Sequence, residues 1–144
     1  MELTEIFSFI YMSKSFIEKD TEVICKEYKL TSSSLSLLLF LAHFPDLNTS
    51  KQICKFGGLK RGNVSVLVEI LTKRGFIKQE TDEKDRRLKY LFLTDKSTKI
   101  IEKVDVIHEK YKKVIKNNIS EEDLNICEKV FLQMYKNIKE NSNN

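Results

Sequence analysis

The most informative part of the chain is residues 49–94, TSKQICKFGGLKRGNVSVLVEILTKRGFIKQETDEKDRRLKYLFLT. Its first residues, TSKQ, have the form of a capping box, in which the Thr and Gln side chains each accept a backbone N–H of the other. The helix opened by Thr49 must be short, because Gly57-Gly58 interrupts it. A further helix, predicted over 59–74, has apolar residues on one face and is closed by Gly75. Two helices joined by a Gly-containing turn are typical of a helix-turn-helix.

The pattern then changes from helical to extended. Residues 76–81 alternate in side-chain character, and residues 88–93 are mostly apolar and aromatic. Between them lies Asp82-Glu83-Lys84-Asp85-Arg86-Arg87, in which every residue is charged. Two strands flanking such a loop predict an antiparallel hairpin. The charged loop must face solvent or a charged partner, because burying it would cost too much free energy.

Helices are predicted on both sides of this central stretch. Residues 3–28 have apolar side chains at helical spacing. A second helix has Thr31 as a candidate N-cap, is apolar nearly all round, and ends at Pro45. Two long amphipathic helices follow residue 94, the last opened by Ser120. The expected fold is mainly α (α+β), a winged helix-turn-helix with a two-stranded β-wing and helical regions at both ends.

Composition excludes several classes of protein. The chain has 144 residues, of which 41% are hydrophobic, and one Pro, so it suits one compact domain or a small domain with helical extensions. The longest apolar run, residues 37–42, has six residues, whereas a membrane span needs about 20. The first ten residues are acidic and lack the basic region of a signal peptide. We therefore expect a soluble, cytoplasmic protein with no membrane partner.

The positive charge is concentrated in one block. Residues 51–90 hold eleven Lys or Arg and five Asp or Glu, a net charge of +6, whereas the rest of the chain has a net charge of −2. Such asymmetry points to a polyanionic partner for the central block.

No cofactor, metal site or catalytic constellation is expected. The chain has three cysteines, Cys25, Cys54 and Cys127, with no metal-binding spacing, and two histidines, His43 and His108, on separate predicted helices. We expect each His to be a core or surface residue and each Cys to be a small buried hydrophobe. A redox-sensing thiol is the alternative for the cysteines. The absence of a Ser-His or paired-carboxylate arrangement argues against an enzyme.

The second helix of a helix-turn-helix presents its first residues to base edges in the major groove of DNA. Arg can bond guanine and Asn can pair with adenine. The wing would bring Arg86 and Arg87 to the DNA backbone and the adjacent minor groove, with Asp85 holding a neighbouring Arg extended. The expected contacts in the recognition helix are Lys60, Arg61, Asn63, Ser65 and Val66, the last through a thymine methyl. Phosphate contacts are expected from Thr31, Ser32, Thr49 and Lys51.

Two segments resemble a known family. Residues 85–94, DRRLKYLFLT, resemble the wing signature of MarR-type winged-helix regulators, in which Asp-x-Arg is followed several residues on by Leu-Thr. Residues 59–77, LKRGNVSVLVEILTKRGFI, resemble the recognition helix of that family and its exit into the wing. The resemblance covers nearly the whole chain. The chain departs from the family at Val66, where a basic reader is usual, at Lys60 and Gly62, and at Gly57, which replaces an apolar residue of the turn.

The resemblance implies a homodimeric, sequence-specific double-stranded DNA-binding transcriptional regulator. Residues 1–30 and 95–144 would form the dimerisation region, and residues 31–94 the DNA-binding lobe that addresses a pseudo-palindromic operator. Relatives of this kind are often repressors released from DNA by small phenolic or lipophilic effectors, and we expect the same here. A winged-helix module that binds protein, or a thiol-based redox-sensing regulator, remains the alternative.

Overall fold

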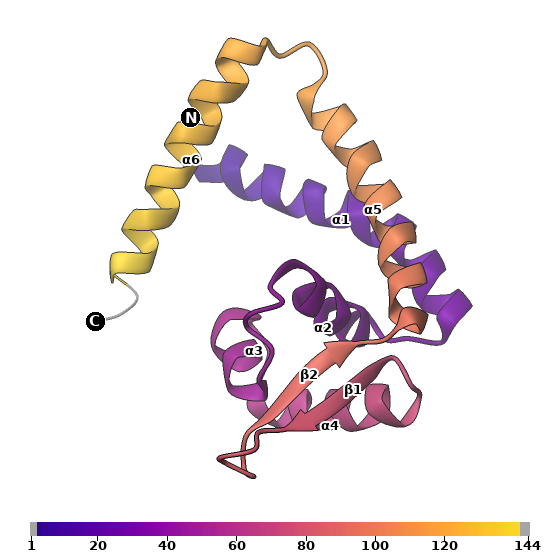
Figure 1. Ribbon diagram of the computed structural model, residues 1–144. Helices are drawn as coiled ribbons and strands as arrows, with labels where there is room; N and C mark the ends of the chain where they lie inside the picture. The colour runs from indigo at the N-terminus through magenta and orange to yellow at the C-terminus, as the bar shows by residue number, and fades with distance from the viewer. Residues whose placement is uncertain (1–2, 142–144) are drawn as a thin grey trace. The chain divides into compact units, whose positions relative to one another are not determined.

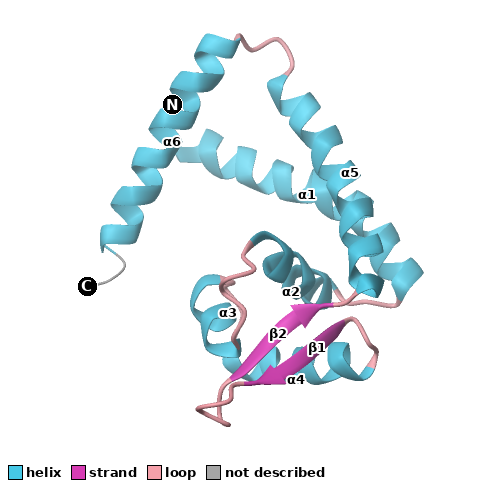
Figure 2. Cartoon of the chain, in the orientation of Figure 1, coloured by secondary structure: helices cyan, strands magenta, loops and turns pink. Residues whose placement is uncertain are grey.

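The computed structural model describes residues 3–141 of the chain, which divides into two compact units, residues 1–108 and 109–144. Within these described residues the fold is mainly helical, with one two-stranded antiparallel sheet, as predicted (Figures 1 and 2). No helix within residues 3–141 is long and apolar enough to cross a membrane. The elements are α1 (Leu3–Tyr28), α2 (Ser32–His43), α3 (Ser50–Phe56), α4 (Arg61–Lys73), β1 (Ile77–Thr81), β2 (Lys89–Leu93), α5 (Asp95–Lys116) and α6 (Glu121–Asn141).

The core of the first unit is built around α2. This helix begins after Thr31, whose hydroxyl oxygen accepts the backbone N–H of Ser34 at 3.1 Å, and ends two residues before Pro45. Six of its twelve side chains are buried, because other elements pack against it. Leu37 and Leu38 are fully buried and share one core cluster with side chains from α3, α4, both strands and α5.

The helix-turn-helix consists of α3 and α4. The predicted capping box is confirmed: Thr49 Oγ1 accepts the N–H of Gln52 at 3.4 Å, and Gln52 Oε1 accepts the N–H of Thr49 at 3.1 Å. Gly57 directly follows α3, and a Cβ there would lie 2.6 Å from the carbonyl oxygen of Ile53 and 3.2 Å from the Phe40 ring. The apolar side chain that is usual in the family at this turn would therefore clash with Ile53 of α3 and Phe40 of α2.

The recognition helix α4 begins two residues later than predicted, at Arg61 rather than Leu59. Its N-cap residue, Lys60, makes no side-chain capping bond, since an ammonium group has no acceptor to offer a backbone N–H. The other end matches the prediction. Gly75 has a φ of +73° and donates to Thr72 O, while Phe76 N donates to Leu71 O, both at 2.9 Å, which is a Schellman arrangement.

The wing is a hairpin of β1 and β2 whose register runs from Ile77 opposite Leu93 to Thr81 opposite Lys89. Ile77 and Leu91 are buried and fasten the wing to the core. The segment before α3 lies along β2, where the N–H of Leu91 donates to Asn48 O at 2.8 Å. The wing and the start of α3 are therefore held beside each other.

The end of α1 is fastened to the same lobe by Arg74. Its Nη1 donates to Lys29 O and its Nη2 donates to Tyr28 O, each at 2.6 Å. These carbonyls lie just where α1 ends, so the guanidinium satisfies acceptors that the helix leaves unpaired. The first half of α5 is anchored by Ile100 and Val104, both fully buried.

Candidate nucleic-acid interface

Helix α4 divides into a buried face and an exposed face. Val64, Leu67, Val68 and Leu71 are buried against the core. All the predicted recognition-helix contacts, Lys60, Arg61, Asn63, Ser65 and Val66, are exposed. The spacing of apolar residues therefore predicted the exposed face of α4 correctly. Val66 is 55% exposed, which leaves an apolar contact available on a mostly polar surface.

The start of α4 has space for close approach by a partner. Gly62 is exposed, and a Cβ built there would meet nothing within 4 Å, so no packing contact in the described chain requires glycine. The first N–H groups of the helix have no side-chain cap, and unpaired N–H groups at a helix start attract anions such as phosphate.

The charged turn of the wing is organised by Asp82. Its Oδ1 accepts the backbone N–H of Lys84 and that of Asp85, both at 2.8 Å. Its Oδ2 accepts the Tyr90 hydroxyl at 3.3 Å. The backbone N–H groups of Asp85 and then Lys84 lower the pKa of Asp82, because they stabilise its charged form. Burial, followed by the charge of Asp82, raises the pKa of Tyr90.

A second acidic residue of the turn, Asp85, supports the wing through the backbone. Its Oδ1 accepts the N–H of Arg87 at 3.0 Å. The sequence-based hypothesis gave Asp85 a bond to a guanidinium, whereas this bond goes to the main chain. Arg86 and Arg87 are both exposed. Figure 2 shows the turn that bears them projecting beyond the ends of the two strands.

Asp82 and Tyr90 help to shape the turn of the wing, and neither was among the residues predicted from the sequence. The signal for Asp82 is present, since an Asp directly after a strand commonly accepts backbone N–H groups two and three residues on. The partner, Tyr90, is eight residues away and can be identified only from the strand pairing.

A basic groove joins α3, α4 and the wing. It has a volume of about 570 Å³, and four of its lining residues are cations: Lys51, Arg61, Arg87 and Lys89. No Asp or Glu is among the described residues that line it. These are Thr49, Ser50, Lys51, Cys54, Arg61, Ser65, Gln79, Arg87, Leu88 and Lys89.

The groove brings together five of the predicted contact residues from three separate elements. They are Thr49 and Lys51 at the start of α3, Arg61 and Ser65 in α4, and Arg87 in the wing. Thr31 and Ser32 lie elsewhere, at the exposed start of α2, and Ser32 lines a different pocket. Their phosphate contacts stay predictions.

That second pocket is lined by residues of α1 and α2 and by His108 of α5, and it has a volume of about 680 Å³. Its lining mixes apolar side chains, including Ile17, Leu35 and Leu39, with polar and charged ones, including Glu18 and Glu22. The volume falls in the range of small-molecule sites, about 300–1,000 Å³.

The three cysteines differ in exposure. Cys25 is buried, and burial, followed by the charge of Glu22, raises the pKa of its thiol. Cys54 is half-buried and Cys127 is exposed. The expectation that each is buried is therefore confirmed for Cys25 and is wrong for Cys127, which lies on a helix that buries no residue within the described chain.

Comparison with known proteins agrees with this geometry. The sequence profile of the MarR family matches residues 28–88. An uncharacterized HTH-type transcriptional regulator, YwaE of Bacillus subtilis (strain 168), is 28% identical over 106 residues, which are 72% of this chain and 61% of that relative. The chain therefore spans about three-fifths of the length of that relative.

Two solved structures share the fold. A mutant of MepR from a multidrug-resistant S. aureus clinical isolate superposes with a TM-score of 0.77 at 24% identity, over 96% of this chain and 99% of that one. A MarR-family regulator from Listeria monocytogenes, solved in complex with a 26mer DNA, superposes with a TM-score of 0.76 at 18% identity, over 98% of this chain and 91% of that one.

Proposed function

We propose that the chain belongs to the MarR family, whose sequence profile matches residues 28–88, and that it is a transcriptional regulator that binds double-stranded DNA. The observation that carries this proposal is the basic groove, in which Lys51, Arg61, Arg87 and Lys89 meet without a carboxylate among the lining residues. Cations from three elements can contact successive phosphates while the exposed face of α4 enters the major groove. The DNA-bound relative from Listeria supports this use of the fold.

Sequence readout is assigned to the exposed face of α4 and to the wing. Arg61 and Asn63 have side chains that pair with guanine and adenine, and Val66 can contact a thymine methyl. Arg86 and Arg87 at the wing turn suit a narrow minor groove, where the negative potential is strongest. Because Val66 is apolar, the wing and the shape of the duplex carry a larger share of specificity.

We further propose that two copies assemble through α1, α6 and the part of α5 that precedes α6. Helix α6 buries no residue within the described chain, although Phe131 is 69% exposed and Tyr135 is 60% exposed. In α1, Phe7 is 66% exposed and Met12 is 67% exposed. Apolar surface on this scale marks an interface. A two-fold dimer would cover it and would place two winged lobes, residues 31–94, on the halves of a pseudo-palindromic operator.

The regulator is proposed to act as a repressor that a small phenolic or lipophilic effector releases. The pocket between α1 and α2 is the candidate effector site, because it is large enough for such a molecule and lies against the helix proposed for dimerisation. A ligand there can shift α1 against α2, which belongs to the same core cluster as the recognition helix.

The deciding experiment is a fluorescence-anisotropy titration of a labelled duplex taken from upstream of the protein's own coding sequence. A random duplex of equal length serves as the control. We expect tighter binding to the upstream duplex and a steep, linear fall of log affinity with log salt concentration, since phosphate contacts release counterions. If neither duplex binds at low salt, the proposal is wrong and the winged helix binds something other than DNA.

A further inference from the structure

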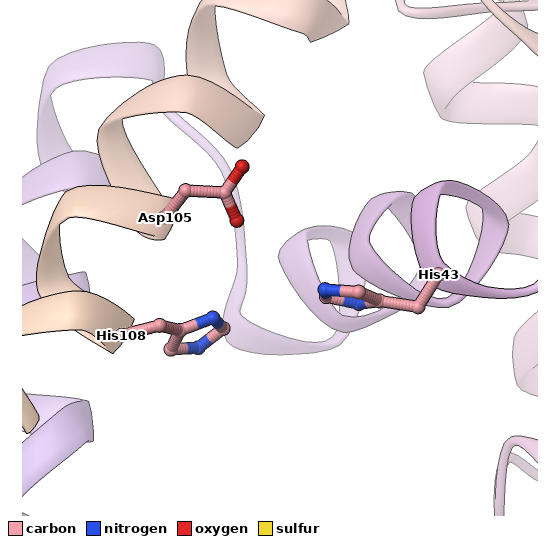
Figure 3. Close-up of side chains that lie close together, drawn as sticks. All are labelled: His43, Asp105 and His108. Carbon is pink, nitrogen blue, oxygen red and sulfur yellow. The ribbon is translucent and has the colours of Figure 1, made fainter. Parts of the chain in front are cut away.

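Three metal-ligating side chains converge where the end of α2 faces α5. His43 is the last residue of α2, and Asp105 and His108 lie in α5. One ligand atom from each lies within 4.8 Å of the other two. Figure 3 shows the two imidazoles and the carboxylate pointing into the same space from opposite sides. The imidazole rings have centroids 6.2 Å apart and planes inclined at 35°. All three residues belong to the first unit of the chain.

The backbone that carries these side chains is held by the core. Asp105 and His108 are three residues apart on a helix, so they share one face. Val104, next to Asp105, is fully buried and anchors that part of α5. On the other side, Leu41 is buried and anchors the last turn of α2 before His43. The cluster therefore joins two positioned helices at the protein surface.

Two imidazoles and one carboxylate form a ligand set suited to a divalent transition-metal ion. Imidazole suits zinc, copper, iron and nickel, and zinc accepts His and Asp together. Four-coordinate zinc with bonds of about 2.0–2.2 Å brings neighbouring ligand atoms to about 3.4 Å from one another. The present spacing is wider, but His43 and Asp105 are exposed and His108 is half-buried. Side-chain rotation can therefore close the site without moving buried groups.

We propose that His43, Asp105 and His108 bind a divalent transition-metal ion, with Zn²⁺ as the preferred ion and water or another ligand in its fourth position. The ion would cross-link α2 and α5. The site cannot be recognised from sequence spacing, because the two histidines are far apart in the chain and come together only through packing. The proposal does not depend on DNA binding, so its test and that of the proposed function can fail separately.

The test uses the full chain, freed of metal, and measures Zn²⁺ affinity by competition with a chromophoric chelator. The chain has two histidines and both are in the cluster, so loss of imidazole ligation reports on this site alone. The background carries Cys54→Ser and Cys127→Ser, which removes the two more accessible thiols as competing ligands. Thermal unfolding with and without Zn²⁺ gives a second readout, since an ion that binds only the folded state raises the melting temperature.

In that background we expect one Zn²⁺ per chain and a raised melting temperature. His43→Ala and His108→Ala should each weaken affinity by at least the roughly 10–100-fold that follows loss of an outer-shell partner. Asp105→Asn should also weaken it. The matched controls are Asp46→Asn, three residues after His43, and Glu102→Gln, three residues before Asp105, both exposed. These should bind as the background does, and circular dichroism checks that every variant is folded.

A Co²⁺ titration separates the proposed ligands from thiols. Nitrogen and oxygen ligation gives visible d–d bands without the near-ultraviolet sulfur-to-cobalt band. Absence of Zn²⁺ binding in the background would overturn the proposal. So would unchanged affinity in both histidine variants when they are folded, or a cobalt spectrum dominated by sulfur.

Discussion

The carboxylate of Asp82 accepts the backbone N–H of Asp85 at 2.8 Å, across the charged turn of the wing. A second backbone N–H, from Lys84, reaches the same oxygen. An acidic residue thus shapes the turn that displays two arginines on a basic surface. Removal of Asp82 should therefore have two opposite effects on DNA affinity. Loss of the turn's hydrogen bonds should weaken binding, whereas loss of a negative charge should strengthen it.

Replacement of Asp82 by Ala or by Asn separates these two effects. Asp82→Asn removes the negative charge and keeps an acceptor oxygen for the turn, whereas Asp82→Ala removes both. We expect Asp82→Ala to bind the upstream duplex roughly fivefold more weakly than Asp82→Asn, because backbone hydrogen bonds of the turn are lost. Anisotropy titrations at one salt concentration provide the comparison. Equal or tighter binding by the Ala variant would show that the carboxylate does not organise the wing for DNA.

Arg87 lines the basic groove, and Arg87→Ala should weaken duplex binding by about 1–3 kcal/mol. The slope of log affinity against log salt should also become shallower by about one, if one phosphate contact is lost. Sedimentation should show an unchanged assembly state. Lys99→Ala is the matched control, because it removes one exposed positive charge from α5, outside the groove. An equal loss in both variants would mean that Arg87 acts only through net charge.

Asn63 lies on the exposed face of α4 and should read a base. Asn63→Ala is expected to weaken binding to the upstream duplex by about 1–3 kcal/mol and to leave binding to a random duplex nearly unchanged. The measured quantity is the ratio of the two affinities at fixed salt. A proportional loss on both duplexes would assign Asn63 to the DNA backbone instead.

Phe131 is the most exposed large apolar side chain described in α6. Phe131→Glu should shift the protein from two chains to one in sedimentation equilibrium, because a charge in a closed apolar interface lacks solvation. Helical content should be retained, since the side chain has no buried contact within one chain. Lys129→Glu, on the opposite side of α6, should leave the assembly unchanged. A wild-type protein that sediments as one chain would remove the dimer from the model of operator binding.

Cys25 should react slowly with thiol-specific reagents. Burial raises its pKa, so at neutral pH it is the protonated thiol, and the reactive thiolate appears only at higher pH. In the Cys54→Ser, Cys127→Ser variant, we expect native Cys25 to react with a disulfide reagent at least about tenfold more slowly than in urea-unfolded protein. Similar rates in the two states would restore the redox-sensing alternative for this residue.

Much of the fold could be predicted because its signals are local. The capping box at Thr49, the left-handed Gly75 and the period change after it each depend on neighbouring residues. The start of α4 was predicted two residues too early, because periodicity locates the apolar face of a helix and not its first residue. A capping side chain would have marked the start, but Lys60 makes no side-chain capping bond.

The order of the elements, the outward face of α4 and the charged turn of the wing can all be predicted from local patterns, because periodicity, caps and charge act over a few residues. The three-dimensional packing is needed to learn that Lys51, Arg61 and Arg87 line one groove, and that His43 lies close to Asp105 and His108. These residues are distant along the chain, and their meeting depends on how buried apolar faces pack. That packing sums many weak contacts, which no short stretch of sequence encodes.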